Sequence, residues 1–293
     1  MNKVLVTGGA GFIGSNLVDV LINRGVDVLV IDNLSTGKIE NINARATFFK
    51  EDLSIIANDK LVSILNGVDV IFHLAALPRI GPSFKNPKEV CDINVGGTQN
   101  ILDLARKYEI PVVYAGSSSF WGGVYKNPYT FSKWQGEELC KMYEQIYGLN
   151  VTICRFYNVY GDFMPTEGEY RTVIPIFLEQ YRAGDSLTIT GDGEQRRDFT
   201  HVDDIVDAMV KVVKLNKWGS VYELGRGENH SINEVAEMFR FGNLSHDIPP
   251  VKYIDPIPGE VRNTLCKSEL ARKKLKWNPK INLKEWVKEQ LCK

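Results

Sequence analysis

Short runs of apolar residues alternate, through the first half of the chain, with longer stretches whose apolar residues recur every three or four positions. The short runs suit buried strands and the longer stretches suit amphipathic helices. Strands that are apolar at nearly every position and are joined by helices are typical of a parallel sheet covered on both faces. The pattern therefore predicts an α/β fold with a doubly wound parallel sheet. The expected strands are residues 3–7, 26–33, 46–53, 68–76, 111–118 and 150–161, and the expected helices are residues 15–25, 59–67, 94–109 and 129–148.

The pattern loosens after residue 161, where helices at 172–184, 201–216 and 231–239 alternate with short strands at 186–191 and 220–225. Ser231 and Glu234 form a capping box at the start of one of these helices. A proline-rich segment, 247–263, leads to a C-terminal helix. We expect residues 1–165 to form the sheet domain, to which 200–225 return. Residues 166–199 and 226–293 then form a smaller C-terminal α/β lid; the family resemblance described below implies that this lid is substrate-binding.

Composition narrows the class of protein. The 293 residues carry 35 basic and 36 acidic side chains, a formal net charge of -1, which gives no overall attraction to nucleic acid or to an anionic membrane. Five scattered cysteines and four histidines show no spacing typical of a disulfide framework or a metal site. No signal peptide precedes the first strand, and no apolar run approaches the ~20 residues that span a bilayer. We expect a cytoplasmic protein without a metal.

The segment TGGAGFIG, residues 7–14, lies between the first strand and the first helix. Its glycines fit the pattern Gly8-x-x-Gly11-x-x-Gly14 and also the pattern Gly9-x-Gly11-x-x-Gly14. Glycine lets backbone N–H groups approach a pyrophosphate at the start of a helix. The alternative is a tight turn with a structural role only, but a strand before the segment and a helix after it favour a dinucleotide site.

Asp32 ends the second strand, 18 residues after Gly14. A carboxylate at this place accepts both adenosine ribose hydroxyls and repels a 2′-phosphate, so we expect NAD rather than NADP. The alternative is that Asp32 caps a turn with Asn33 and Ser35. Asp52 and Leu53, after the third strand, are placed to meet the adenine.

The fourth strand ends in HLAA, residues 73–76. The small residues after His73 let a cofactor cross the edge of the sheet. His73 itself is more often a hydrogen-bonded core histidine than a ligand or a base.

Tyr129 and Lys133 stand four residues apart, and thus on one face of the helix expected at 129–148. A tyrosine that acts as a base near neutral pH needs its pKa lowered by ~3 units from ~10. A lysine ammonium beside it acts in that direction. A serine hydroxyl from the end of the preceding strand can bond the same substrate oxygen. A solvated helix face is the alternative, which the upstream glycine loop disfavours.

The chain resembles the extended short-chain dehydrogenase/reductase family, in particular its NAD-dependent nucleotide-sugar epimerases and dehydratases. The resemblance covers nearly the full length and rests on TGGAGFIG, DNLS, HLAA, SSS, YTFSK, RFYNVYG, GDGEQRRDFTHVDD and PGEVRN. It implies a Rossmann sheet that binds NAD, and a catalytic triad of Ser119, Tyr129 and Lys133, with Ser118 as the second choice of serine. The implied cofactor contacts are Gly8, Gly11, Phe12, Ile13, Gly14, Asp32, Asn33, Ser35, Thr36, Gly37, Asp52, Leu53, Leu74, Ala75, Ala76, Asn94, Ser117, Tyr129, Lys133 and Tyr157.

The same matching implies a set of substrate contacts in the second half of the chain. Arg197 and Arg262 match arginines on the diphosphate, where a guanidinium fork suits the phosphate oxygens. Arg197 pairing with Asp198 or Asp203 is the alternative. The full implied set is Ser118, Ser119, Asn158, Thr172, Val173, Arg197, Glu260, Arg262 and Thr264.

The reaction is chosen by elimination. Dehydratases of the family carry Asp-Glu just after the active-site hydroxyl, where this chain has Phe120 and Trp121. Decarboxylases usually carry a glutamate in this region, and none stands between Ser119 and Tyr129. The remaining chemistry needs one base, and is 4-epimerisation of a UDP-hexose such as UDP-glucose or UDP-galactose. Alternatives are a nucleotide-sugar 4-keto reductase or dehydrogenase, a dehydratase, and a non-catalytic NAD-binding sensor.

Only nine residues separate Ser119 from Tyr129, against about twenty or more in family epimerases. The resemblance implies a more open sugar pocket, which Phe120, Trp121 and Tyr125 could wall. The gate position of the family falls on Thr264, whose small side chain leaves room for an N-acetyl group, so UDP-N-acetylglucosamine is also expected to bind. The family further implies a homodimer formed through the helices around 95–108 and 131–147.

Overall fold

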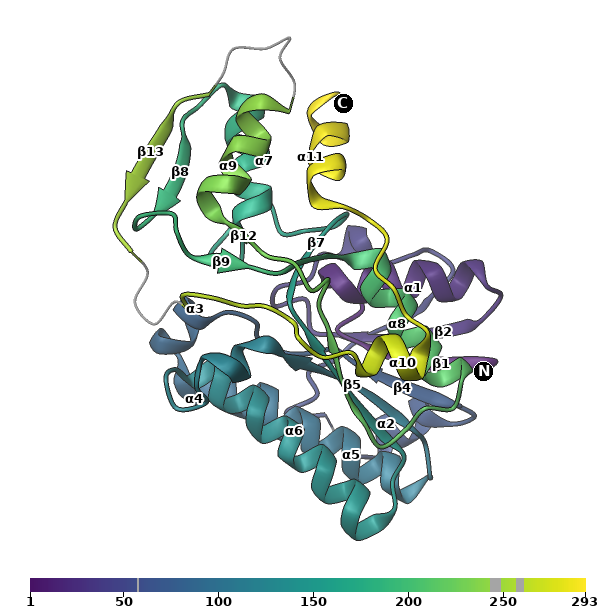
Figure 1. Ribbon diagram of the computed structural model, residues 1–293. Coiled ribbons are helices and arrows are strands. Elements are labelled where there is room, and N and C mark those ends of the chain that lie inside the picture. The colour runs from purple at the N-terminus through teal and green to yellow at the C-terminus, as the bar shows by residue number, and fades with distance from the viewer. Residues whose placement is uncertain (57, 243–248, 257–260) are drawn as a thin grey trace.

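The computed structural model describes residues 1–56, 58–242, 249–256 and 261–293. Its centre is a sheet of seven parallel strands in the order β11-β6-β5-β4-β1-β2-β3 (Figure 1). The order runs outward in both directions from β1 and β4, which confirms the doubly wound sheet. The strands are β1 (Lys3–Thr7), β2 (Asp27–Asp32), β3 (Thr47–Lys50), β4 (Val70–His73), β5 (Val112–Ser117), β6 (Val151–Phe156) and β11 (Val221–Leu224).

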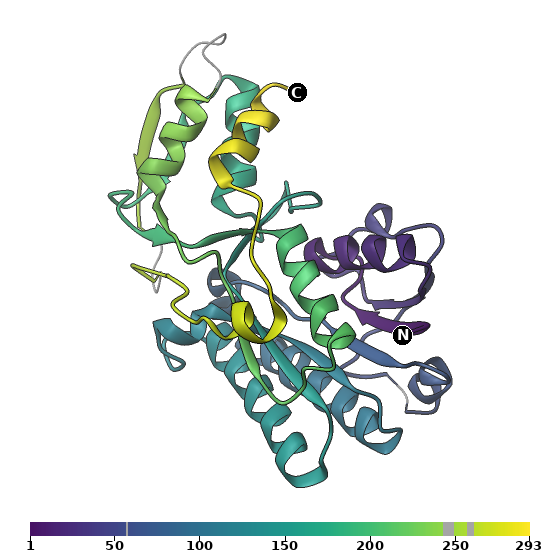
Figure 2. The same cartoon turned by 45° about the vertical axis from the view of Figure 1, so that its right-hand side comes forward.

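Helices cover both faces of this sheet (Figures 1 and 2). Val4 and Val6 lie in the core on one face and Leu5 in the core on the other, because successive side chains of a strand point to opposite faces. Both faces of the sheet are thus shielded from solvent, which is why the strands appear as continuous apolar runs in the sequence. The helices on the first face are α1 (Phe12–Asn23), α8 (Val202–Lys214) and α10 (Leu270–Leu275), and those on the second are α2 (Asn58–Leu65), α5 (Gly97–Lys107) and α6 (Pro128–Tyr147).

The region between β4 and α5 contains more helix than expected. Two short helices, α3 (Ile80–Lys85) and α4 (Pro87–Cys91), and a π-helical turn at Asp92–Gly96 precede α5. Pro87 at the start of α4 suits a first helical position, where no N–H is needed. A short 3-10 turn, η1 (Ile39–Asn41), follows β2.

The prediction of a single strand over 150–161 is wrong. The chain leaves the sheet at Tyr157, and β7 (Asn158–Tyr160) pairs instead with β10 (Phe199–His201). The Asn158 N–H donates to the carbonyl of Asp198. An unbroken apolar run carries no mark of this change of partner, since both segments are buried.

The lid has its own core, at the upper left of Figure 1. Helices α7 (Val173–Ala183), α9 (Ile232–Phe241) and α11 (Leu283–Leu291) enclose it together with β8 (Leu187–Thr190), which pairs with β13 (Val251–Ile254). A second small pair joins β9 (Arg196–Arg197) to β12 (His230–Ser231). The predicted capping box of Ser231 and Glu234 is present at the start of α9.

Two helices, α10 and α11, replace the one expected at the C-terminus. Ala271, Leu275 and Trp277 are buried in the core of the sheet, whereas α11 packs in the lid. We therefore propose that residues 270–277 belong to the sheet domain, and that the other domain limits stand as expected.

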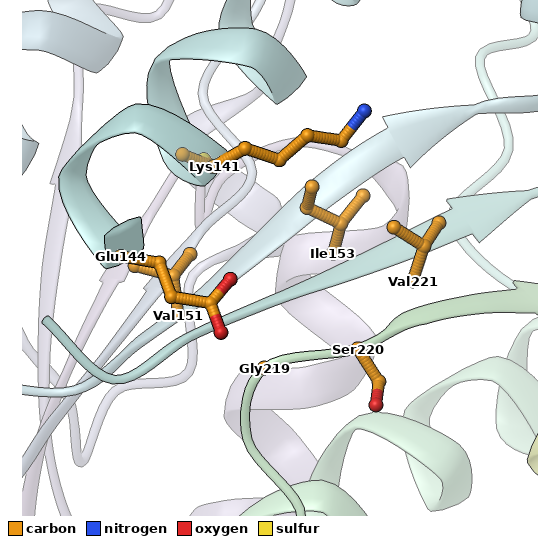
Figure 3. A pocket seen from close by; sticks show the side chains of 8 residues that line it. Lys141, Glu144, Val151, Ile153, Gly219, Ser220 and Val221 are labelled. Atoms are coloured by element: carbon orange, nitrogen blue, oxygen red, sulfur yellow. The ribbon is translucent and has the colours of Figure 1, made fainter. Parts of the chain in front are cut away.

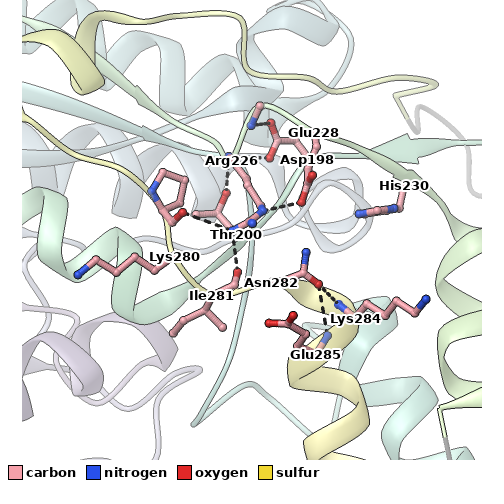
Figure 4. Close-up of polar contacts among 12 residues, drawn as sticks. Asp198, Thr200, Arg226, Glu228, His230, Lys280, Ile281, Asn282, Lys284 and Glu285 are labelled. Atoms are coloured by element: carbon pink, nitrogen blue, oxygen red, sulfur yellow. Dashed lines mark hydrogen bonds and ion pairs between the residues drawn. The ribbon is translucent and has the colours of Figure 1, made fainter.

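Asp198 joins the segments that connect the sheet domain to the lid. Its buried carboxylate accepts backbone N–H groups from Arg226, Gly227 and Cys266 at 2.8, 2.9 and 3.0 Å, and Figure 4 shows it among these segments. The Arg226 guanidinium in turn donates to the carbonyl of Ile281 at 3.0 Å. Strands and loops distant in sequence are thereby tied at the edge where the predicted site residues lie.

Candidate active site

The carboxyl ends of β1, β2, β4 and β5 meet at one edge of the sheet, because these strands are parallel neighbours. The predicted cofactor residues follow these ends, and α6 begins beside the end of β5. The N-terminus of α6 is well defined, since the Asn127 side chain accepts the Thr130 N–H at 2.8 Å and Pro128 occupies the first turn. Tyr129 therefore lies in the first turn of a long helix.

The glycine loop between β1 and α1 has no room for side chains. Gly8 has φ +71°, and a Cβ there would lie 2.7 Å from the Ala75 nitrogen. A Cβ on Gly14 would lie 2.1 Å from the Gly8 carbonyl oxygen. Gly11 is the N-cap of α1 and provides no capping side chain, which leaves the first N–H groups of the helix for another acceptor. The loop thus fits a pyrophosphate.

Asp32 is buried at the end of β2. Its carboxylate accepts the Leu34 N–H at 2.8 Å and the Ala10 N–H at 3.0 Å, so it caps the following turn as well as bracing the glycine loop. Burial raises its pKa, and the two N–H groups oppose this. A carboxylate has about four acceptor sites, so room for ribose hydroxyls remains.

Asp52 is fixed next to this turn. Asn33 Nδ2 and Ser54 Oγ donate to its carboxylate at 3.0 and 2.6 Å. Burial alone would raise its pKa, but these bonds and the Ser54 N–H lower it below its ordinary value. Ser35, Thr36 and Gly37 follow in the same turn, where the Lys38 N–H donates to the Ala10 carbonyl.

His73 is a core histidine, as its surroundings show. Its Nδ1 lies 2.7 Å from Thr7 Oγ1, its Nε2 lies 3.0 Å from Thr98 Oγ1, and burial lowers its pKa to about 3. Leu74, Ala75 and Ala76 follow it against the glycine loop, where the Ala75 N–H donates to Thr7 Oγ1.

Asn94 and Tyr157 are also buried within the protein. Asn94 joins the segment after β4 to α6, since it accepts the Leu77 N–H at 2.7 Å and donates to Ser132 Oγ at 2.9 Å. Tyr157 lies beside Gly225, and a Cβ on that glycine would reach its ring at 3.0 Å.

The serine that contacts Tyr129 is Ser117, and neither Ser119 nor Ser118. Tyr129 Oη donates to Ser117 Oγ at 3.4 Å, and Ser117 Oγ donates to Ser119 Oγ at 2.9 Å. The strand expected over 111–118, with Ser119 directly after it, ends one residue earlier: β5 ends at Ser117, and Ser118–Gly122 turns away as a 3-10 helix, η3. Three serines in a row cannot show in sequence where the strand ends.

Lys133 lies one turn after Tyr129 and is buried. Its Nζ lies 4.3 Å from the centroid of the Tyr114 ring, and among the described residues no acceptor bonds it. Burial lowers its pKa to about 8, against the opposing charge of Glu137. A buried ammonium with only an aromatic face for support is suited to ligand hydroxyls.

Arg79 is a charged residue near this site that the sequence analysis did not identify, because it belongs to no motif. Its Nε donates to the carbonyl of Tyr170 at 3.0 Å. Burial raises the pKa of Tyr129, whereas the Ser117 hydrogen bond and the Arg79 charge lower it. The only sign of Arg79 in the sequence is that a basic residue follows shortly after the end of the fourth strand.

Between Ser117 and Tyr129 the chain is held by a buried ion cluster. Arg155 makes bonds of 2.6–3.0 Å to Glu137 and lies 4.0 Å from the centroid of the Phe120 ring. Trp121 Nε1 donates to Glu223 at 2.7 Å. A Cβ on Gly122 would lie 2.5 Å from Val261, so η3 closes against the lid. Tyr125 is 81 % exposed and does not contribute to this wall.

The structure brings some of the predicted substrate residues in the second half of the chain into contact and leaves others apart. Asn158 Nδ2 donates to Thr264 Oγ1 at 3.2 Å, which brings these two together. Arg197 is buried and donates to the Arg196 carbonyl at 2.9 Å. Arg262 forms a bidentate pair with Asp192, at 2.7 and 2.9 Å, which lowers the Asp192 pKa to about 2.

Three predicted substrate contacts of the lid remain. Two lie at the start of a helix, and the third lies outside the described residues. Thr172 is the N-cap of α7 and Val173 its first residue, and the Thr172 side chain makes no capping bond. Glu260 lies outside the described residues.

A hollow of about 210 Å³ lies elsewhere, between α6 and the amino-terminal halves of β6 and β11 (Figure 3). Lys141, Glu144 and Val151 are among its lining residues, and none of the site residues above belongs to it. Among the described residues, no group of histidine, cysteine and acidic side chains could hold a metal ion. No helix in the described part of the chain is long and apolar enough to cross a membrane.

Residues 4–225 match the profile of the NAD dependent epimerase/dehydratase family. A protein of Methanocaldococcus jannaschii, whose name gives it as a UDP-glucose 4-epimerase, is 38% identical over 97% of this chain and 96% of its own. The UDP-N-acetyl-alpha-D-glucosaminuronate decarboxylase of Bacillus cytotoxicus is 30% identical over 99% of this chain and 96% of its own.

Among solved structures, the chain is similar to the UDP-N-acetylglucosamine 4-epimerase of Methanobrevibacter ruminantium M1, in complex with UDP-N-acetylmuramic acid. The TM-score is 0.90 at 32% identity, and the match covers 99% of this chain and 97% of the other.

Proposed function

This chain belongs to the NAD-dependent epimerase/dehydratase family, and within that family we propose that it is a 4-epimerase of a UDP-hexose. The observation that carries the proposal is the Tyr129–Ser117 contact in a site whose connecting stretch has no carboxylate. With Ser117 as the active-site hydroxyl, the positions of the dehydratases' Asp-Glu pair fall on Ser118 and Ser119, rather than on Phe120 and Trp121. Neither hydroxyl replaces a carboxylate as acid or base, so the elimination still holds.

The site fits the cofactor of the family, NAD. The bare glycine loop, the N-terminus of α1 and the Asp32 carboxylate would hold its pyrophosphate and adenosine ribose, and the unbonded ammonium of Lys133 would hold its other ribose. Bound NAD would supply a hydride acceptor and donor for C4, so that a 4-keto sugar forms and is reduced on the other face.

Protein groups handle the proton and the orientation. Tyr129, as phenolate, takes the proton of the 4-hydroxyl, and Ser117 bonds the same oxygen. After the sugar has turned over, Tyr129 returns its proton to the C4 oxygen. Arg197 and Arg262 hold the diphosphate, for which Arg262 must exchange its Asp192 partner, and this anchor keeps the nucleotide in place while the sugar rotates.

Two serine variants test the proposal that Ser117 is the active-site serine. Ser117→Ala is expected to lower kcat about 10- to 100-fold, because one hydrogen bond to the reacting oxygen is lost. Ser119→Ala, its matched control two residues away, is expected to change kcat less than about threefold. Steady-state epimerisation assays check both, and a larger effect for Ser119→Ala would restore the serine expected from sequence.

The sugar pocket is proposed to accept a 2-acetamido group. Thr264 occupies the gate with a small side chain, and a solved 4-epimerase that resembles this chain is named for UDP-N-acetylglucosamine. Purified protein is expected to interconvert UDP-glucose with UDP-galactose and also UDP-N-acetylglucosamine with UDP-N-acetylgalactosamine. Incubation with these sugars and with UDP-glucuronate, with products resolved by NMR, measures reaction and substrate together.

The same experiment separates the rival reactions. Net NADH production, a 6-deoxy-4-keto product or loss of carbon dioxide would contradict epimerisation. Turnover of UDP-glucose without turnover of the N-acetyl sugar would leave the reaction standing and exclude the wider pocket.

Two further points are proposals of the same kind. A homodimer through α5 and α6 is supported by exposed apolar residues on and beside these helices, namely Tyr108, Met142, Ile146 and Tyr147. A cytoplasmic location is supported by five free cysteines, as is typical of a reducing compartment.

A further inference from the structure

Arg79 has a backbone conformation that residues other than glycine rarely adopt. It is the N-cap of α3, with φ +100° and ψ +138°. Strained residues of this kind persist only where the surrounding structure holds them, and they gather at functional sites. The strain directs attention to what the side chain does.

The guanidinium of Arg79 joins the segment after β4 to the segment before α7. Nε donates to the Tyr170 carbonyl, in the segment before α7, at 3.0 Å. Helix α3, which Arg79 precedes, packs against α6, whose second residue is Tyr129. Leu77, two residues before Arg79, is tied through Asn94 to Ser132 on α6, and Ser132 Oγ donates to the Tyr129 carbonyl at 2.9 Å. These bonds hold the segment that carries Arg79 at the start of α6. Burial raises the pKa of Tyr129, and the Arg79 charge opposes this rise. Among the described residues, no carboxylate pairs with Arg79.

At higher pH, the other groups near Tyr129 do not supply a full positive charge. Lys133, one turn along α6, has a pKa of about 8 and loses its charge within the working range of a base. The N-terminus of α6 contributes only a partial charge. Arg79 remains protonated throughout, because a guanidinium starts above pH 12 and burial lowers it only from there. The elements packed on α6 carry further ionisable groups, most of them in pairs. These include Tyr114 on β5, Lys85 on α3 paired with Glu169, Lys88 on α4 paired with Asp92, Glu89 on α4, Arg106 on α5 paired with Asp103, Lys107 on α5, and Arg155 on β6 paired with Glu137 on α6.

We propose that Arg79 is a positioning residue for the reaction, whose guanidinium, fixed by the Tyr170 carbonyl beside Tyr129, supplies the permanent positive charge that holds Tyr129 as phenolate. This inference rests on the proposed function, in which Tyr129 is the base. Lys133 is then free to act chiefly on the cofactor, and the strain at Arg79 is the cost of placing a second cation here.

The experiment compares Arg79→Gln, Arg79→Lys and a control, Lys85→Gln. Lys85 is an exposed cation on α3 that pairs with Glu169, next to Tyr170, and it touches nothing in the site. Two quantities are measured against pH on NAD-loaded protein. One is kcat for epimerisation. The other is the tyrosinate ultraviolet difference absorbance, corrected with the Tyr129→Phe variant.

In Arg79→Gln, the acid limb of kcat and the Tyr129 titration are both expected to move up by about one to two pH units, as for unit charges several ångströms apart at an effective dielectric constant of about 20. At pH 7, kcat then falls about 10- to 100-fold, and it recovers as the pH rises. Arg79→Lys is expected to restore most of the shift, and Lys85→Gln to cause none.

Three results would overturn the proposal. An equal loss of kcat at every pH, with an unmoved tyrosinate titration, would give Arg79 a structural role only. A loss confined to substrates with an acidic sugar would make it a substrate contact. Full activity in Arg79→Gln would remove any role. If the wild-type protein epimerises nothing, the proposed function fails, while the tyrosinate titration still decides whether Arg79 stabilises the phenolate.

Discussion

Tyr129→Phe is expected to lower kcat by about 10³-fold, because general base catalysis by one side chain contributes about 10²- to 10⁴-fold. The fold should survive, since the lost hydroxyl makes one long hydrogen bond, of 3.4 Å, to Ser117. NMR-detected epimerisation measures the effect, and thermal unfolding with determination of bound NAD confirms an intact protein.

Tyr125→Phe is the matched control for this change. Tyr125 lies four residues earlier and is 81 % exposed, so the same chemical change there is expected to leave kcat within about twofold. Unchanged turnover in Tyr129→Phe would remove Tyr129 as the base, and would with it remove the premise for the role of Arg79.

Arg155→Met is expected to lower the free energy of unfolding by about 3–5 kcal/mol. Arg155 is buried with Glu137, which it bonds at 2.6 Å, and it also reaches Glu223 at 3.4 Å. Removing the cation leaves two buried carboxylates without a counter-charge, and that loss is much larger than the net value of the pair. Urea unfolding followed by circular dichroism measures the change.

Lys88→Met is the control on the surface. Lys88 on α4 pairs with Asp92, and both side chains are exposed, so the expected change is below about 1 kcal/mol. Equal effects of the two substitutions would show that removing Arg155 does not leave buried carboxylates without a counter-charge. Because Phe120 and Trp121 rest on this cluster, Arg155→Met should also lower kcat by displacing η3.

The fold class and the cofactor loop were predictable because their signals are local. Apolar runs identify strands buried on both faces, and Gly11 and Gly14 pack against the Gly8 carbonyl oxygen within one loop. Gly8 itself lies against the distant Ala75, but the strand before the loop and the helix after it mark the loop in the sequence. Tyr129 and Lys133 belong to the same group, since helical spacing alone places them on one face. Asp32 was located in the same way, as the last residue of a recognisable strand.

The limits of the prediction lie where contacts join distant segments. The apolar run at 150–161 could not show that the chain changes partner at Tyr157, because β10, which receives β7, lies forty residues further on. The C-terminal segment likewise reads as one helix, although Trp277 returns to the core of the sheet while α11 packs in the lid.

The serine that contacts Tyr129 and the position of Arg79 depend most clearly on the tertiary structure. Ser117, Ser118 and Ser119 are chemically identical, and only the register of β5 against β6 determines which hydroxyl meets Tyr129. Arg79 lies fifty residues before Tyr129 and belongs to no motif, yet the packing of α3 on α6 and the Asn94 bonds to Leu77 and Ser132 bring its segment to the start of α6. Residue types and spacings by themselves thus determined the fold class and the candidate chemistry of this chain, because side-chain chemistry and helix periodicity are local. Which of three equivalent serines contacts Tyr129 was decided by the packing of separate segments, because hydrogen-bond partners depend on distance in space and not on distance along the chain.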